Sequence, residues 1–209
     1  KSTLVKLMNR FYDVSRGSIE INGVDIRKYN LESLRTQIGY VAQKAHMFKG
    51  SIRSNICFGK PEASVEEMVH AATVAQASNF ISTRECGYED EIAEDGTNIS
   101  GGQKQRLSIA RVILKKPSLY IYDDSFSALD FKTDATLRKA LKPEVKNAIF
   151  FVVAQRISTI MDSDMIIVLD EGQIIGMGTH AQLLKDCSVY QEIAHSQLTQ
   201  KELDDYERN

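Results

Sequence analysis

The feature that most constrains the fold is a set of short, almost continuously apolar runs that alternate with helical patterns. These runs are "IGYVA" (38–42), "SLYIY" (118–122), "AIFFVVA" (148–154) and "MIIVL" (165–169). A strand that is apolar on both faces must be covered on both faces, as in a parallel sheet between helices. The sequence therefore predicts an α/β fold with a mostly parallel sheet flanked by helices.

Helical patterns fill much of the chain between these strands. Residues 51–85 show repeated helical spacing, and Ser64 and Glu67 have the separation of a capping box. We also expect helices in "KSTLVKLMNRFYD", "QKQRLSIARVILKK", 133–141, "HAQLLK" and "VYQEIAHSQL", a hairpin in "GSIEINGVDI", a strand or hairpin in "GQIIGMG", and a solvated helix end in "KELDDYERN".

Composition narrows the class of protein. A net charge of -2 over 209 residues favours neither nucleic acid nor an anionic membrane surface as a partner. The cysteines Cys57, Cys86 and Cys187 lack the spacing of metal ligands and indicate reduced thiols. The apolar runs are too short to cross a bilayer, so we expect any membrane span to come from another segment or chain.

Polar side chains stand where several of the predicted strands end. Gln43, the pair Asp123 and Asp124, and Gln155 each come directly after an apolar run. In open α/β sheets, ligands bind beyond the carboxyl ends of the strands. A carboxylate in that position can hold Mg²⁺, although a turn with two solvated aspartates is an equally good explanation of the pair alone.

Two glycine- or hydroxyl-containing stretches could bind phosphate. Lys1, Ser2 and Thr3 open a helix as the end of a phosphate-binding loop does, yet taken alone most such starts are ordinary surface helices. We expect the glycines of such a loop to lie before Lys1, outside this sequence. "ISGGQKQR" is more specific, because Ser100 can cap the next helix and Gly101 and Gly102 let a phosphate approach the backbone.

Together these motifs identify a family resemblance that covers essentially the whole chain. "ISGGQKQRLSIARVILKKPSLYIYDDSFSALD" resembles the nucleotide-binding domain of ATP-binding cassette (ABC) transporters, specifically of exporters. The resemblance matches each motif to residues of this chain: Lys1, Ser2 and Thr3 to the end of the Walker A loop, Gln43 to the Q-loop, Ser100, Gly101, Gly102 and Gln103 to the signature loop, Asp123 to the Walker B aspartate, Ser127 to Asp130 to the D-loop, and Gln155 to the switch position.

The resemblance implies roles, cofactors and domain limits. It implies ATP and Mg²⁺, with the metal held by Ser2, Gln43 and Asp123 and catalysis assigned to Asp124, Gln155 and Gln43. The nucleotide would be bound by Lys1, Ser2, Thr3, Ser100, Gly101, Gly102, Gln103 and Asp130. We expect residues 1–209 to form one N-terminally truncated nucleotide-binding domain, with a helical subdomain at about 45–115 and an ATPase core made by 1–44 and 116–209.

Two residues depart from the family pattern. The family places a glutamate directly after the Walker B aspartate and a histidine at the switch position, whereas this chain has Asp124 and Gln155. An aspartate carboxylate falls about 1.5 Å short of a glutamate's reach, and a glutamine cannot become a cation. We therefore expect this chain's own site to bind ATP and hydrolyse it poorly, while its signature loop is near consensus.

This combination predicts a heterodimeric exporter, similar to bacterial multidrug-type exporters, at the cytoplasmic face of the cell membrane. The expected partners are a second nucleotide-binding domain with Glu and His, and transmembrane domains, with no nucleic acid. The alternative is an ATP-gated regulatory or assembly module with no turnover of its own. A chromosome-maintenance ATPase is a weaker reading, because long coiled coils would separate Ser100 from Asp123 in such a chain.

Overall fold

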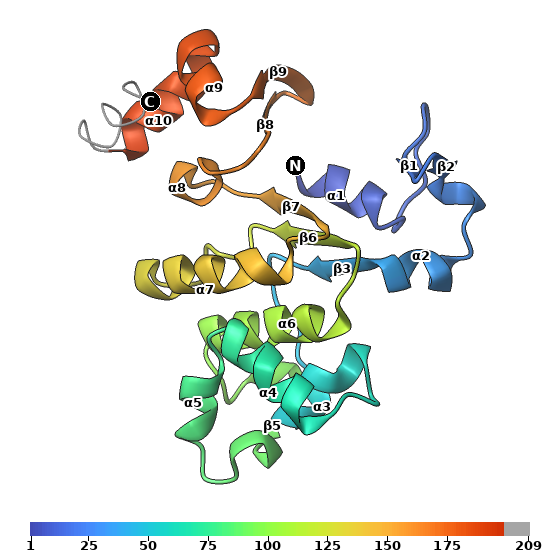
Figure 1. Ribbon diagram of the computed structural model, residues 1–209, viewed down its shortest axis with the longest axis vertical. Helices are drawn as coiled ribbons and strands as arrows, with labels where there is room; N and C mark the ends of the chain where they lie inside the picture. Colours follow the sequence, from blue (N-terminus) through green and yellow to red (C-terminus); the bar gives the residue numbers. More distant parts are fainter. Residues whose placement is uncertain (199–209) are drawn as a thin grey trace. The chain divides into compact units, whose positions relative to one another are not determined.

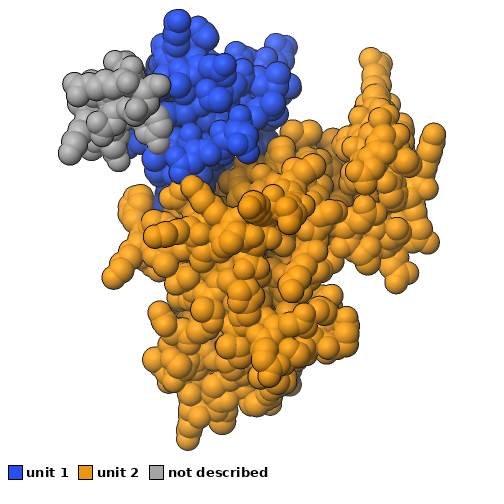
Figure 2. Space-filling model, in the orientation of Figure 1, with its two compact units in different colours: residues 1, 154–209 blue, residues 2–153 orange. Residues whose placement is uncertain are grey.

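The computed structural model describes residues 1–198, and the chain forms two compact units (Figures 1 and 2). One unit is Ser2–Val153, and the other begins at Ala154 and includes Lys1. The segment "KELDDYERN", expected to be a solvated helix end, lies outside the described residues. None of the helices described is both long enough and apolar enough to cross a bilayer.

The larger unit contains most of the regular structure. Its helices are α1 (Ser2–Met8), α2 (Leu31–Gln37), α3 (Ile52–Ile56), α4 (Val65–Val74), α5 (Ser78–Ser82), α6 (Gly101–Lys115) and α7 (Phe131–Glu144). Its strands are β1 (Glu20–Ile21), β2 (Val24–Asp25), β3 (Ile38–Val41), β4 (Gly50–Ser51), β5 (Glu91–Ile92), β6 (Leu119–Asp123) and β7 (Ile149–Val153). Short 3₁₀ turns occur at Ile26–Lys28, Cys57–Gly59, Gly87–Glu89 and Glu94–Gly96.

A parallel three-stranded sheet of order β3-β6-β7 forms the centre of this unit. Ile38 pairs with Leu119, and Leu119 pairs with Ile149, so the three strands start together, and β3 ends one residue before β6 and β7. The predicted α/β fold with a parallel sheet is confirmed. The predicted hairpin is also present, as β1 paired antiparallel with β2.

The two faces of the sheet belong to different hydrophobic clusters, because side chains alternate along a strand. Leu119 and Ile121 lie on the face that packs with Val5 of α1 and Leu34 of α2. Tyr120 and its alternating neighbours pack on the other face with α6 and α7. Both faces of the central strand β6 are therefore covered, as its near-continuous apolar sequence predicts, whereas the residues of β7 are half-buried or exposed.

Helix α6 joins this second face to the helical block. In Figure 1, α3, α4 and α5 gather around α6 below the strands. The capping box predicted at Ser64 and Glu67 is present at the start of α4, where each residue bonds the other's backbone. The division into a helical subdomain at about 45–115 and an ATPase core stays a prediction.

The smaller unit is built around a hairpin and three helices. Its elements are α8 (Ile157–Ile160), β8 (Ile166–Asp170), β9 (Gln173–Gly178), α9 (His180–Asp186) and α10 (Ser188–Gln197). The strand predicted at 165–169 is β8, but its expected place in the parallel sheet is wrong: it pairs antiparallel with β9 in a separate sheet, and its residues alternate between buried and more exposed. Ile157, Ile166, Val168, Leu183 and Tyr190 are buried together in the core of this unit.

Gly39 offers a direct test of how closely α6 packs on the sheet. A Cβ atom at Gly39 in β3 would lie 2.5 Å from Val112 Cγ1 and 2.6 Å from Pro117 Cγ. We expect Gly39→Ala to lower the free energy of unfolding by about 1–3 kcal/mol, the usual cost of overpacking. Urea unfolding of the variant and the wild type measures this.

Gly59→Ala is the matched control. At Gly59 the nearest atom to an added Cβ is the Arg111 carbonyl oxygen at 3.8 Å, an ordinary contact. We expect its midpoint to stay near that of the wild type. Equal midpoints for Gly39→Ala and Gly59→Ala would contradict the packing described for β3.

Candidate functional site

The carboxylate of Asp123 is directed toward α1 by the pleat of β6. Asp123 is the last residue of β6 and continues the alternation of Leu119 and Ile121, which face the cluster that contains α1. Ser2, at the start of α1, donates its hydroxyl to Asp123 Oδ1 at 3.0 Å. The structure thus brings together Ser2 and Asp123, two of the three residues that the sequence predicts as metal ligands; the side chain of the third, Gln43, donates to Asp124 at 3.1 Å.

A second hydroxyl reaches the same carboxylate from β3. Tyr40 OH donates to Asp123 Oδ2 at 3.3 Å. Burial raises the pKa of Tyr40 to about 12, with a further contribution from the Asp123 charge, so this hydroxyl remains a donor at neutral pH. Sequence reasoning missed Tyr40, although its position on a strand that ends beside the site was a usable signal.

The surroundings of Asp123 fit a divalent cation. The residue is only 2% exposed, and its carboxylate accepts hydrogen bonds from the neutral hydroxyls of Ser2 and Tyr40. Across residues 1–198, no Lys, Arg or His lies within ion-pair distance of this carboxylate. A buried carboxylate and a hydroxyl are hard oxygen donors of the kind that Mg²⁺ uses together with substrate phosphates.

Mg²⁺ needs few ligands from the protein when phosphates supply the others. The described part of the chain has no cluster of three or more His, Cys, Asp or Glu that could hold a metal alone. Ser2 and Asp123 would hold the ion.

Asp124 lies just beyond the strand and points elsewhere. Its φ of 50° is in the left-handed region, which aspartate tolerates better than most residues. The backbone N–H donates to the Val153 carbonyl at 2.9 Å, and the side-chain Oδ2 accepts from Gln43 Nε2 at 3.1 Å. The side chain is 8% exposed. Backbone geometry thus separates the two adjacent carboxylates, and Asp124 contacts the predicted Q-loop residue.

The backbone before Gln43 is fixed by two buried polar residues. Ser125 Oγ donates to the Val41 carbonyl at 3.0 Å, and Gln105 Nε2 donates to the Ala42 carbonyl at 3.1 Å. Ser125 and Gln105 are 0% and 1% exposed. They set the direction in which the chain leaves β3, and sequence reasoning missed both. A polar residue among the apolar positions of α6 was the available signal for Gln105.

The predicted signature loop forms the N-terminus of α6. Ser100 Oγ accepts from the Gln103 backbone N–H at 3.2 Å, and Gln103 Oε1 accepts from the Ser100 N–H at 2.9 Å. A Cβ atom at Gly102 would lie 3.3 Å from the Ala128 carbonyl, whereas one at Gly101 would meet no atom within 4 Å. The packing of this chain therefore restricts residue 102 but does not require a glycine at residue 101.

Asp130 caps the next helix. Its Oδ1 accepts from the Thr133 backbone N–H at 2.9 Å, and this hydrogen bond lowers the pKa of the carboxyl group. Thr3 is exposed in the first turn of α1. Lys1 and Gln155 belong to the other compact unit, so their grouping with the cluster stays a sequence-based prediction.

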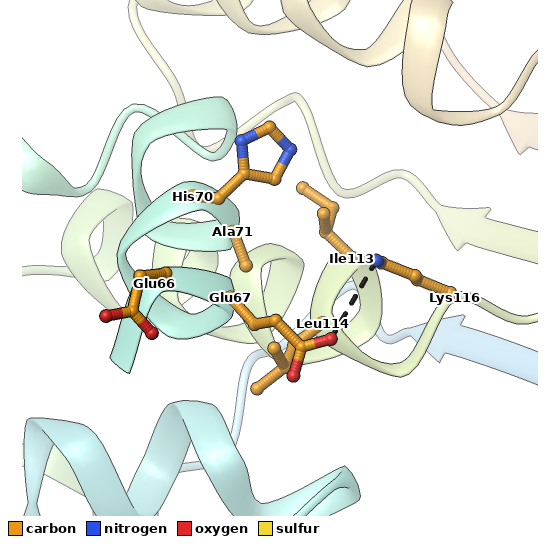
Figure 3. Close-up of a pocket in the computed structure, with 7 residues that line it drawn as sticks. All are labelled: Glu66, Glu67, His70, Ala71, Ile113, Leu114 and Lys116. Atoms are coloured by element: carbon orange, nitrogen blue, oxygen red, sulfur yellow. Dashed lines mark ion pairs between the residues drawn. The ribbon is translucent and has the colours of Figure 1, made fainter. Parts of the chain in front are cut away.

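A cavity between α4 and α6 is separate from these residues (Figure 3). Its volume is about 260 Å³, and an ion pair between Lys116 Nζ and Glu67 Oε1, 3.9 Å apart, lies at its edge. None of the predicted site residues lines it; the lining residues are Glu66, Glu67, His70, Ala71, Ile113, Leu114 and Lys116. The candidate site is therefore the group at the strand ends.

Comparison with known proteins gives concordant matches. The family described as "ABC transporter" matches residues 1–127. YgaD of Bacillus subtilis, an ATP-binding/permease protein assigned provisionally to multidrug export, is 47% identical over 193 residues, which are 92% of this chain and 33% of YgaD. The fatty acid ABC transporter ATP-binding/permease protein of Mycobacterium bovis is 40% identical over 196 residues, 94% of this chain and 31% of that protein.

A solved structure matches in fold as well as in sequence. It is a bacterial Atm1-family ABC exporter with ATP bound, similar with a TM-score of 0.91 and 38% identity over 94% of this chain and 35% of that one. The chain spans about a third of the length of these relatives.

The two hydrogen bonds to Asp123 generate a test on Tyr40. Tyr40→Phe removes one of the donors to a buried carboxylate, so we expect it to lower the free energy of unfolding by about 1–2 kcal/mol at neutral pH. Because the pKa of Tyr40 is raised to about 12 in the folded state, from about 10 in the unfolded chain, this contribution is complete below pH ~10 and is lost as the pH rises further. Urea unfolding at several pH values measures it.

Tyr122→Phe is the matched control. Tyr122 precedes Asp123 in β6, and its buried hydroxyl has no hydrogen-bond partner among the described residues. Removing a hydroxyl that has no partner should be neutral or stabilising at pH 7. An equal loss of stability in both variants would mean that the Tyr40–Asp123 bond contributes nothing of its own.

Proposed function

The chain belongs to the ABC transporter family, and from that premise we propose that it is the domain of an exporter in which ATP binding and hydrolysis are coupled to transport across a membrane. The observation that carries the proposal is the group of Ser2, Tyr40 and Asp123, beside Asp124 and Gln43 at the strand ends. On this proposal, transmembrane domains and a second nucleotide-binding domain are its partners. It would work at the cytoplasmic face of the cell membrane.

Each residue of the group has a distinct task in this proposal. Ser2 and Asp123 would hold Mg²⁺, and the bound ion would supply positive charge near the phosphates of ATP. Ser2 and Tyr40 hold both oxygens of the Asp123 carboxylate, so its orientation is set before nucleotide arrives. Gln43, through its bond to Asp124, links the Q-loop to the position from which a general base would act.

We further propose that this chain's own site hydrolyses ATP weakly. General-base catalysis contributes about 10²–10⁴ in rate and requires hydrogen-bond reach to the attacking water. Asp124 has a shorter side chain than the family's glutamate, and its carboxylate accepts a hydrogen bond from Gln43. Gln155, at the switch position, can donate a hydrogen bond to a γ-phosphate but cannot carry a positive charge.

The signature loop supports the proposal that the partner's site is the competent one. In the family arrangement, the signature loop of one domain faces the ATP held by the other. Gly101 is exposed at the N-terminus of α6, and space around it is open. Backbone N–H groups at a helix N-terminus favour an anion. The partner's site would therefore be the competent one, in a heterodimer whose partner supplies Glu and His.

The weak-site proposal is tested by restoring the family residues. In the assembled exporter, with the partner's base removed, Asp124→Glu with Gln155→His should raise single-turnover ATP hydrolysis by about 10²-fold or more. Asp124→Asn is the control, and it should change little because Asp124 contributes little as a base. An unchanged rate in the double variant would refute the weak-site proposal.

The same assay separates an exporter domain from a regulatory module without turnover. If export stops whenever ATP hydrolysis at the partner's site is abolished, the result supports coupling of hydrolysis to export. ATP-dependent assembly with no hydrolysis by the wild-type complex would favour the regulatory module instead.

Gly101 tests the role of the signature loop. Ala at residue 101 meets no atom within 4 Å and occupies the first position of α6, so Gly101→Ala should leave stability unchanged or raise it. We expect the ATPase activity of the assembled exporter to fall about tenfold or more, because a methyl group would keep the partner's phosphate from the backbone. Gly59→Ala should retain activity. Full activity of Gly101→Ala would contradict the proposed role.

A further inference from the structure

The side chain of Gln197 makes two hydrogen bonds to the backbone of the loop that carries Gln155. Gln197 is the last residue of α10, and its Nε2 donates to the Gln155 carbonyl at 2.9 Å. Its Oε1 accepts from the Ile157 backbone N–H at 2.8 Å. One amide group therefore holds the chain on both sides of Arg156.

This contact replaces a cap that the loop lacks. Ile157 is the first residue of α8, a helix of four residues, and the N-cap residue Arg156 makes no side-chain capping bond. N–H groups in the first turn of a helix have no partner within the helix. Gln197, 40 residues away in sequence, supplies the acceptor for Ile157. The first backbone N–H of α8 is thus held by a side chain of α10.

Helix α10 can serve as a firm support because it is anchored in the core of its unit. Tyr190 and Ala194 are 2% and 0% exposed. The Tyr190 hydroxyl lies 2.7 Å from His180 Nδ1 of α9, a buried side-chain hydrogen bond. Gln197 is one helical turn beyond Ala194, so the position of its side chain follows from that packing.

We propose that Gln197 is a positioning residue for the switch loop. By holding the Gln155 carbonyl and the Ile157 N–H, it fixes the backbone from which the Gln155 side chain projects, and so determines whether that amide can meet the γ-phosphate of bound ATP. The proposal rests on the switch function proposed for Gln155. On this proposal, α10 contributes to the discrimination between ATP and ADP.

The test compares binding of Mg-ATP and Mg-ADP to the full chain that carries this domain, by calorimetric titration. Gln197→Ala should weaken ATP binding by roughly three- to tenfold, part of the value of a hydrogen bond to a charged group, and leave ADP binding unchanged. ADP has no γ-phosphate, so a general loss of structure would weaken both nucleotides equally. Equal weakening would overturn the proposal.

Gln191→Ala is the matched control on the same helix. Gln191 Nε2 also bonds backbone carbonyls, those of Leu184 at 2.5 Å and Lys185 at 3.3 Å, but these lie in α9. This variant should keep the ATP-to-ADP affinity ratio of the wild type. A change in the ratio as large as that of Gln197→Ala would show that any loosening of α10 suffices, which contradicts a specific role for Gln197.

Gln155→Ala separates this proposal from the one it rests on. If Gln155→Ala lowers the affinity ratio and Gln197→Ala does not, only the positioning role fails. If neither variant lowers it, the switch function of Gln155 fails and the positioning role with it. If both lower it, adding Gln197→Ala to Gln155→Ala should produce no further loss, because the two residues act through one contact.

A second measurement covers the case in which Gln197→Ala does not fold. Gln197→Glu keeps an acceptor for the Ile157 N–H but loses the donor to the Gln155 carbonyl, so it should lower the affinity ratio while Ile157 keeps its protection from hydrogen exchange. An unchanged ratio in this variant would overturn the proposal.

Discussion

A buried carboxylate at the end of a parallel strand is the constraint on which the site depends. Asp123 is almost fully enclosed, and its two carboxylate oxygens accept hydrogen bonds from hydroxyl groups of α1 and β3. Burying a charge is costly unless it is hydrogen-bonded or meets a counter-ion. This requirement joins the start of α1, the end of β3 and the end of β6. It also explains why a metal ion that accompanies a polyphosphate suits the position.

The adjacent aspartates Asp123 and Asp124 have different hydrogen-bond partners because the backbone turns their side chains in different directions. Strand alternation turns Asp123 toward α1, while the left-handed conformation of Asp124 turns the next side chain toward Gln43. Strained backbone of this kind is kept where the surroundings fix it, and here the bond from the Asp124 N–H to the Val153 carbonyl does so. On the weak-site proposal, a one-methylene difference in side-chain length would matter, because the direction of the carboxylate is already set.

Local patterns in the sequence predict the framework well. The apolar runs predict β3, β6 and β7, and Ser64, three positions before Glu67, predicts the capping box of α4, since caps depend only on near neighbours. The contacts of Tyr40, Ser125, Gln105 and Gln197 join residues 40 to 84 positions apart. No periodicity encodes such pairs, because they depend on which strands and helices become neighbours. Motifs in the sequence thus indicate candidate site residues, whereas the residues that position them become visible only in the structure.

The central claim is that this chain binds ATP at a site that turns it over weakly and completes a competent site on a partner. The most direct measurement is the chemical state of nucleotide retained by the assembled exporter after rapid mixing with radiolabelled Mg-ATP and removal of free nucleotide. The account predicts that the nucleotide on this chain's Walker residues remains ATP while that on the partner becomes ADP. Equal conversion of both to ADP at the same rate would contradict it.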